Sequence, residues 1–342
     1  MGLNIAEIIP RKAIEFSELK NKVIAIDAYN TIYQFLSTIR QPDGTPLMDN
    51  KKRVTSHLSG LFYRNINLMQ EGIKLIYVFD GKPPALKYET NKSRAEAKDE
   101  AREKYKQAVS EEDVESMGKY ARQLVRLTPE ILQDSKDLLE AMGICVVQAP
   151  SEGESQAAEV VRYSAYAVGS QDYDSLLFGA SKLIQNLTLA RKRKTVSGYI
   201  YISPELIELD HVLNSLQINL DQLICLGILV GTDYNPGGIR GIGQRKALDI
   251  VKKYRQPYLI FKSVENLMEN QENKFDWQEI YELFHKPEII RNPEINFPKF
   301  DREKIKRILV IEHDFSEERV SSALEKLEHA RRKGGQKTLF TY

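Results

Sequence analysis

Acidic residues occur as two close pairs within residues 150–174. Glu152 and Glu154 form the first pair, and Asp172 and Asp174 form the second. Carboxylates this close together repel each other unless a positive charge lies between them. Oxygen ligands without clustered histidines favour a hard divalent cation such as Mg²⁺ or Mn²⁺. The two pairs therefore indicate a metal site.

Each pair also has a purely structural interpretation. Ser151 and Glu154 have the spacing of a capping box, in which the serine caps a helix and the glutamate bonds back to the helix start. Asp172 and Asp174 would share one face if a strand continued through them, but aspartates are also common in turns. Further acids at the ends of other apolar segments favour the metal interpretation.

Four short apolar segments have the pattern of buried strands that lead into helices. They cover residues 22–27, 73–80, 144–148 and 166–172. Strands that alternate with helices predict an α/β fold with a central, mostly parallel sheet flanked by helices. Ligands of such sheets lie beyond the carboxyl ends of the strands. We therefore expect six acids to converge on one edge: Asp27, Asp80, Glu152, Glu154, Asp172 and Asp174.

Residues 83–128 are rich in charged helix formers and show no strand pattern. Because this segment follows Asp80 directly, it predicts a helical insertion that arches over the acids. Lys87 and Arg94 are seven residues apart, two helical turns on one face, and could reach a phosphate held there. For most residues of the segment, the alternative is an ordinary charged surface helix.

Residues 221–254 combine an apolar helix, a glycine-rich turn and a basic amphipathic helix. The first helix ends at Gly231, and Asp233 follows as a seventh candidate metal ligand. The turn exposes backbone N–H groups at a helix N-terminus, where the helix dipole favours an anion. Such a helix-hairpin-helix element contacts duplex phosphates without reading sequence. Its candidate contacts are Gly241, Gly243, Arg245 and Lys246.

Seven carboxylates without zinc-type histidines predict a site for two hard cations about 4 Å apart. Two such ions activate water and stabilise the leaving oxygen in phosphodiester hydrolysis. Lys87 and Arg94 would offset negative charge in the transition state. The residues thus predict hydrolysis of a nucleic-acid backbone.

Bulk composition limits the class of protein. The chain has 342 residues, of which 42% are hydrophobic and 28% charged, as is typical of a soluble globular protein. Its longest apolar run is too short to span a bilayer and no signal sequence is evident, so we expect an intracellular protein without membrane contact. Cys145 and Cys225 lie in apolar segments and are expected to be buried thiols. A net charge of +1 indicates no global basic field.

Four longer motifs carry a resemblance to a known family. They are VFDGKPPALK, SEGESQAAE, SQDYDSLLFG and GTDYNPGGIRGIGQRKA, in that order along the chain. The sequence resembles the flap endonucleases of the structure-specific 5′ nuclease superfamily over nearly its whole length, and most closely the archaeal members. The resemblance implies a cytoplasmic location for an archaeal chain and a nuclear one for a eukaryotic chain.

The resemblance also implies residue roles. Asp80, Glu152 and Glu154, with Asp27 behind them, match a first Mg²⁺ site. Asp172, Asp174 and Asp233 match a second, and Mn²⁺ is a possible substitute. Lys87 and Arg94 match the pair that polarises the scissile phosphate. The positions that match DNA contacts are Gly2, Tyr33, Arg40, Arg64, Glu152, Gly231, Asp233, Gly241, Gly243, Arg245 and Lys246.

The implied activity is cleavage of 5′ flaps near the junction with duplex, together with 5′–3′ exonuclease activity, in Okazaki fragment maturation and DNA repair. The alternative class is a non-catalytic scaffold that binds DNA junctions or a sliding clamp. An excision-repair relative would need a long insertion before residue 151, which this sequence lacks. A magnesium-dependent assay on a flap substrate separates the two classes.

The sequence suggests four regions. They are an N-terminal nuclease region at 1–105, with an arch at 81–130, an internal nuclease region at 124–255, a helical part at 256–330 and a flexible tail at 331–342. The tail resembles a peptide that docks on a sliding clamp, but it has one terminal aromatic where that peptide normally has two. Its candidate contacts are Gln336, Leu339 and Tyr342. Apart from the clamp we expect a monomer.

Overall fold

The computed structural model describes residues 3–41, 44–111, 113–189, 192–195, 198–271 and 273–336. A seven-stranded sheet lies at its centre, in the order β1-β9-β6-β5-β2-β3-β4. Strands β6, β5, β2, β3 and β4 are parallel. At one edge, β9 pairs antiparallel with β6, and β1 pairs antiparallel with β9. The bounds are β1 (Lys12–Ala13), β2 (Val23–Asp27), β3 (Lys74–Phe79), β4 (Cys145–Gln148), β5 (Ala167–Gly169), β6 (Lys182–Gln185) and β9 (Glu205–Glu208).

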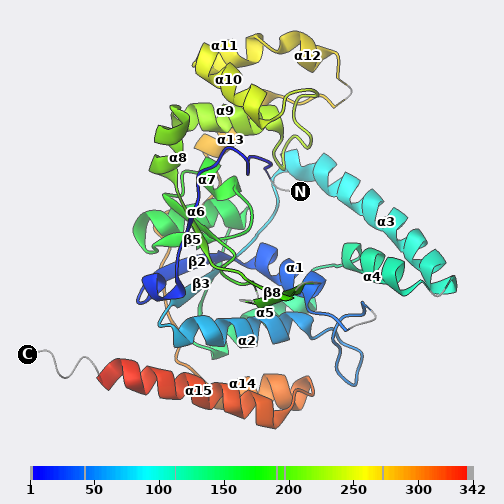
Figure 1. Ribbon diagram of the computed structural model, residues 1–342, viewed down its shortest axis with the longest axis vertical. Helices are drawn as coiled ribbons and strands as arrows, with labels where there is room; N and C mark the ends of the chain where they lie inside the picture. Colours follow the sequence, from blue (N-terminus) through cyan, green and yellow to red (C-terminus); the bar gives the residue numbers. More distant parts are fainter. Residues whose placement is uncertain are drawn as a thin grey trace, which may run out of the picture.

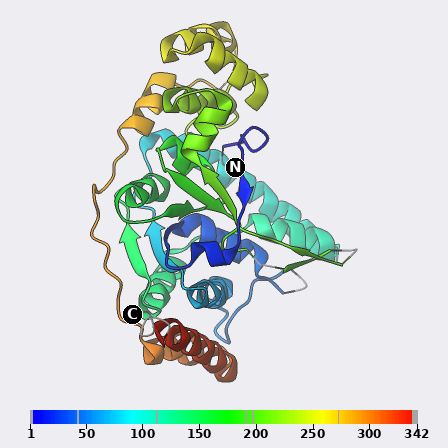
Figure 2. The same cartoon turned by 60° about the vertical axis from the view of Figure 1, so that its left-hand side comes forward.

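Helices cover both faces of the sheet (Figures 1 and 2). Alternating residues of β3 explain why: Leu75 and Tyr77 join one buried core, while Ile76 and Val78 join the other. The first core contains α1 (Ala28–Thr38), α2 (Ser56–Gln70), α5 (Pro129–Ala141), α14 (Arg302–Lys306) and α15 (Glu317–Gln336). The second contains α6 (Gly153–Tyr163), α7 (Asp174–Leu177), α8 (Leu209–Leu216), α9 (Leu220–Val230), α10 (Gln244–Tyr254), α11 (Pro257–Lys262) and α13 (Trp277–His285).

The charged insertion forms two helices that project from the body of the molecule (Figure 1). They are α3 (Tyr88–Ser110) and α4 (Val114–Gln123), which pack against each other. A short 3₁₀ turn, η2 (Ala85–Lys87), precedes α3. Lys87 therefore lies at the foot of the arch rather than within its first long helix. The helical character of the segment is confirmed.

Two local predictions are wrong. Strand β5 ends at Gly169, so Asp172 and Asp174 do not share a strand face; Asp174 instead begins α7. Helix α6 is capped by Glu152 rather than Ser151, and it has no side-chain capping bond. The Ser151 hydroxyl donates instead to the Lys82 carbonyl, 3.1 Å away. The capping-box interpretation of the first acid pair is therefore excluded.

The carboxyl-terminal region extends along the whole molecule. After α13, residues 286–301 form no helix or strand and run down one side of the sheet (Figure 2). They lead to α14 and α15, which pack against α5 and α2. The helix α12 (Glu265–Glu269) lies at the opposite end, beside α11 (Figure 1). The helical part predicted for 256–330 thus contributes to both cores.

Several smaller predictions can be compared with the structure. Cys145 and Cys225 are both buried free thiols, as predicted. A separate antiparallel hairpin is formed by β7 (Lys192–Thr195) and β8 (Gly198–Tyr201). No single helix in the described part of the chain is long and apolar enough to cross a membrane. Helices α8 and α9 pass that test only as a pair, bent by 81°.

Candidate active site

The seven predicted acids gather at the carboxyl edge of four neighbouring strands. Asp27 ends β2, and Asp80 follows β3 directly. Glu152 and Glu154 lie where the chain turns from β4 into α6, and the second aspartate pair follows β5. Because β5, β2, β3 and β4 are adjacent and parallel, these side chains meet at one edge. Asp233 joins them from the turn after α9.

Hydrogen bonds fix several of these carboxylates. Asp27 accepts from the Asn30 backbone N–H at 3.0 Å, as the N-cap of α1. The Asn30 amide also donates to Asp172 Oδ2 at 2.5 Å. Asp80 Oδ1 accepts from the Gly153 N–H at 2.7 Å. A Cβ at position 153 would lie only 2.4 Å from that oxygen, so a glycine is needed there.

The carboxylates strongly perturb one another. Burial, and then the charge of Asp80, raise the pKa of Asp27 to about 8. Burial and then Asp172 raise the pKa of Asp174 to about 7. Burial raises the pKa of Asp80 to about 6, and the charges of Glu152 and Asp233 add to the effect. Groups that resist ionisation in this way form one electrostatic cluster, which we call the acid cluster.

Glu154 completes the acid cluster. Burial, followed by the charges of Asp174, Asp27 and Glu152, raises the pKa of Glu154 well above its usual value. The acid cluster thus comprises Asp27, Asp80, Glu152, Glu154, Asp172, Asp174 and Asp233. It carries more negative charge than a single ammonium can balance.

Lys87 extends into the acid cluster from the foot of the arch. Its Nζ lies 2.5 Å from Glu152 Oε1 and 3.2 Å from Asp233 Oδ2. Burial disfavours its charged form, but Glu154, Glu152 and Asp233 outweigh that effect and raise the pKa of Lys87. The ammonium therefore stays protonated at neutral pH.

The acid cluster fits a hard divalent cation by its donor chemistry, because every donor is a carboxylate oxygen and the mutual repulsion calls for positive charge. Its side chains would have to move, however. Among the described residues, no three His, Cys, Asp or Glu side chains are arranged to hold one metal ion as they stand. In this arrangement the Lys87 ammonium lies between Glu152 and Asp233.

Three residues that support the acid cluster were not predicted from the sequence. The Tyr234 hydroxyl donates a short hydrogen bond to Glu152 Oε2, and the Tyr234 ring lies 5.5 Å from Lys87 Nζ. The Thr90 hydroxyl donates to the Asp233 carbonyl at 2.5 Å. Asn30 is the third, through the bonds given above. Tyr234 follows Asp233 directly, and Asn30 lies three residues after Asp27, as an N-cap partner does.

The glycine-rich turn forms the predicted hairpin between two helices. Gly231 ends α9 with φ of 114°, and a Cβ there would lie 2.6 Å from the Gly238 nitrogen. Gly243 caps α10, whose first turn contains Arg245 and Lys246. A hollow of about 660 Å³ joins the turn to Asp233 and to the foot of the arch. The hairpin thus lies beside the acid cluster.

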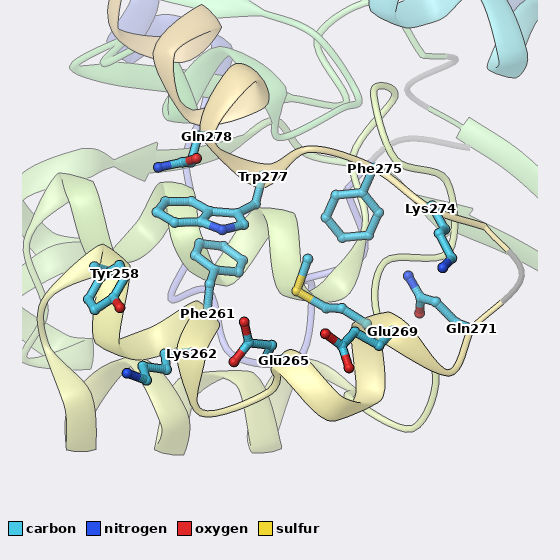
Figure 3. Close-up of a pocket in the computed structure, with 11 residues that line it drawn as sticks. Tyr258, Phe261, Lys262, Glu265, Glu269, Gln271, Lys274, Phe275, Trp277 and Gln278 are labelled. Carbon is cyan, nitrogen blue, oxygen red and sulfur yellow. The ribbon is translucent and has the colours of Figure 1, made fainter.

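A second hollow, of about 330 Å³, lies between α11, α12 and α13, among aromatic side chains (Figure 3). Phe261 and Trp277 stack there with ring centroids 4.2 Å apart. Gln271 accepts from the Arg240 backbone N–H at 3.3 Å, so this region supports the hairpin turn. No residue of the acid cluster lines it, so the sheet edge is the candidate active site.

Comparison with known proteins places this site in a family. The description "XPG N-terminal domain" matches residues 4–101, and "XPG I-region" matches residues 143–233. These two segments contain the whole acid cluster. Flap endonuclease 1 of Pyrococcus furiosus is 52% identical over 342 residues, which cover 99% of this chain and 98% of that protein. The chain belongs to the flap endonucleases.

Two other flap endonucleases support the same family assignment. Flap endonuclease 1 of Hyperthermus butylicus is 51% identical over 97% of this chain and 95% of its own length. A solved flap endonuclease-1 structure from Methanococcus jannaschii is 40% identical, with a TM-score of 0.75, over 97% of this chain and 100% of that one. The predicted fold and family are confirmed. The chain is therefore a metal-dependent nuclease that hydrolyses phosphodiester bonds.

The other residues of this flap endonuclease that were predicted to contact DNA lie outside the acid cluster. Tyr33, on α1, is 40% exposed. Arg40 donates to the Leu36 and Gly44 carbonyls at 3.0 and 2.7 Å. Arg64 is half-buried on α2, and burial lowers the pKa of its guanidinium. Tyr33 lies on α1, Arg40 follows the end of α1, and Arg64 lies on α2, so none of them belongs to the acid cluster.

Some predicted residues cannot be placed. Gly2, Leu339 and Tyr342 lie outside the described residues, as do the side chains of Arg94 and Gln336. Leu3 is described, and its backbone forms a hydrogen bond with Asp174. The first described residue of the chain therefore contacts the acid cluster.

Proposed function

We propose that this flap endonuclease removes single-stranded 5′ flaps from DNA at the junction with duplex, and that it also acts as a 5′–3′ exonuclease in Okazaki fragment maturation and DNA repair. The observation that carries the proposal is the acid cluster, which lies below the arch and beside the hairpin. Lys87, at the foot of the arch, adds a positive charge beside the acid cluster, where a phosphodiester would be cut. A non-catalytic scaffold that binds DNA junctions would need the hairpin but neither the acid cluster nor the lysine beside it.

Two Mg²⁺ ions, or Mn²⁺ as a substitute, are the proposed cofactors. Asp80, Glu152 and Glu154, with Asp27 behind them, would hold the first ion. Asp172, Asp174 and Asp233 would hold the second. Such ions supply an activated water and stabilise the leaving oxygen of the broken bond. The sheet edge, α7 and the turn after α9 bring the seven carboxylates together, and small side-chain movements would complete the two metal sites.

Side chains of this chain would bind and orient the flap. Lys87 offers an ammonium to the scissile phosphate, and we propose that Arg94 of α3 supports it. Tyr33 is exposed enough for a base to stack on its ring. Helices α3 and α4 would enclose the single strand and so favour a free 5′ end. Gly2, next to Leu3 at the acid cluster, would lie close to the cut.

The duplex would lie on the hairpin. Gly243 lines an open hollow at the start of α10, where the helix dipole favours phosphate. Gly241, two residues earlier in the same turn, is the other proposed backbone contact. Arg245 has a side chain that is 83% exposed, and Lys246 lies beside it. We propose further DNA contacts from residues outside the hairpin. These are Arg40, Arg64, Glu152, Gly231 and Asp233.

We also propose a sliding clamp as a partner of residues 331–342, through Gln336, Leu339 and Tyr342. The nuclease regions 1–105 and 124–255 would form the catalytic part, with 256–330 as a helical support. Removing the last seven residues should leave cleavage of free DNA unchanged and abolish stimulation by a clamp. Equal stimulation with and without them would exclude the tail.

Replacement of single acids tests the proposed activity. Asp80→Ala and Asp174→Ala should bind a double-flap duplex measurably, yet cleave it at least about 10²-fold more slowly in Mg²⁺. Asp210→Ala, an exposed acid on α8, is the matched control and should cleave normally. Mapping the product ends should place the cut near the junction. Undiminished cleavage by both active-site variants would refute the metal assignment.

A further inference from the structure

Lys87 lies between acids that belong to the two different proposed metal sites. Its Nζ contacts Glu152 of the first set at 2.5 Å and Asp233 of the second at 3.2 Å. Its side chain is only 13% exposed. The charge of Lys87 also lowers the pKa values of Asp27, Asp80, Glu154 and Asp174 below what burial and repulsion would otherwise give. The ammonium therefore acts on acids of both sets.

Glu152 is engaged through both of its oxygens. Oε1 accepts from Lys87, and Oε2 accepts from the Tyr234 hydroxyl. A cation that approaches Oε1 of Glu152 therefore competes with the Lys87 ammonium. One that approaches Oε2 competes with Tyr234, which is buried and packed against Phe284 with ring centroids 5.4 Å apart. Lys87 has a flexible four-carbon stem and lies on a single 3₁₀ turn. It is the partner that can move.

We propose that Lys87 is the internal counter-ion of the metal-free site, and that divalent cations displace its ammonium from Glu152 and Asp233 when they bind. The inference rests on the proposed metal site. It explains why no three carboxylates in the described chain are arranged to hold a metal while Lys87 lies among them. Without metal, the ammonium limits repulsion within the acid cluster. With metal, the released ammonium lies beside the ions, where a scissile phosphate would arrive.

The displacement can be measured without DNA or catalysis. Lysine labelled with ¹³C and ¹⁵N in the wild-type protein reports each ammonium by NMR, and Lys87→Met assigns the Lys87 signal. In EDTA, the Lys87 ammonium should exchange slowly with water. Addition of Mg²⁺ alone should shift that signal and speed its exchange at least tenfold, with the same midpoint as Mg²⁺ binding measured by calorimetry. Lys82 precedes Lys87 in the same connection and has an exposed side chain. It is the internal control, and its NMR signal should not change when Mg²⁺ is added.

A second variant separates displacement from general electrostatics. Lys87→Met removes the competing ammonium with little change in volume, so Mg²⁺ should bind at least tenfold more tightly. Lys82→Met should change binding less than twofold. Saturating Mg²⁺ that leaves the wild-type Lys87 signal slow and unshifted would overturn the counter-ion role while leaving the proposed nuclease function intact. Absence of any Mg²⁺ binding would overturn both.

Discussion

The Tyr234 hydroxyl is the donor that organises Glu152 within the acid cluster. Tyr234 is almost fully buried, and the hydrogen bond from its hydroxyl to Glu152 joins the hairpin side of the site to the sheet side. A buried carboxylate that loses such a donor keeps its desolvation cost without compensation. Tyr234 therefore supports the active site from one residue beyond a proposed metal ligand.

Tyr234→Phe tests this role. The variant keeps the ring but removes the hydrogen bond to Glu152, so the metal-free protein should lose about 1.5–3 kcal/mol of unfolding free energy, as is typical for a bond to a charged group. Urea unfolding in EDTA measures the loss. Tyr258→Phe changes a ring that is 60% exposed and should leave stability within about 0.5 kcal/mol of wild type. Equal stability of both variants would contradict the proposed role.

Single residues also show where sequence reasoning succeeds and fails. The acids were predictable because each follows a strand, and parallel strands bring their carboxyl ends to one edge. Tyr234, Asn30 and Thr90 were not predictable, because their partners lie 82, 142 and 143 residues away. Only the register of the folded sheet and the position of α3 bring these pairs together.

At the level of elements, the hairpin between α9 and α10 presents basic side chains next to a glycine turn. Arg245 has few restraints, since its ion pair with Glu7 is 3.5 Å long and both side chains are largely exposed. A long, exposed ion pair of this kind is worth little to folding. Arg245 can therefore bind phosphate at little cost to stability.

Arg245→Ala and Lys246→Ala should each weaken binding of duplex DNA by about the same factor on every sequence, because phosphate contacts carry no base information. Each should reduce the slope of log Kd against log salt by about 1. Fluorescence anisotropy between 50 and 200 mM salt measures this. Lys253→Ala, an exposed residue in the last turn of α10, is the control and should retain the wild-type slope.

The elements themselves were largely predictable, and their ends were not. Buried strands β2, β3 and β4 lie within a residue or two of the predicted segments, because β-branched runs bounded by acids and turns mark them clearly. Strand β5 is three residues long, since residues after Gly169 turn toward α7 instead of pairing. The arch was recognised from composition, but η2 was not, and it moves Lys87 out of the long helix.

At the level of the whole molecule, the chain after α13 returns to the far side of the sheet and closes against α2. Arg53 donates a short hydrogen bond to the Glu312 carbonyl, and Asn50 donates its backbone N–H to Asp314 at 3.0 Å. His313 lies between Asp49 and Asp134, with contacts of 3.4 and 3.7 Å. Sequence patterns predicted the helices here but not this docking, which depends on polar contacts more than 170 residues apart.

The docked region contains His57, which is completely buried at the start of α2. Within the described chain, neither of its ring nitrogens has a hydrogen-bond partner. Burial, and then the nearby His313, lower the pKa of His57 to about 3. An unfolded histidine has a pKa of about 6.5. The folded state thus favours neutral His57, whose contribution to stability is complete above pH 6.5 and is lost as the pH falls toward 3.

Replacement of His57 by Leu should therefore flatten the acid side of the stability profile. Between pH 6.5 and 5, His57 alone should cost the wild type about 1.6 kcal/mol, because the slope is half of about 1.4 kcal/mol per pH unit at pH 6.5 and nearly the full value at pH 5. Urea unfolding at both pH values, with EDTA present, measures the difference between the two proteins. His211→Gln, an exposed histidine on α8, should retain the full wild-type dependence. If His57→Leu retains it too, another group controls acid sensitivity where the carboxyl-terminal helices dock.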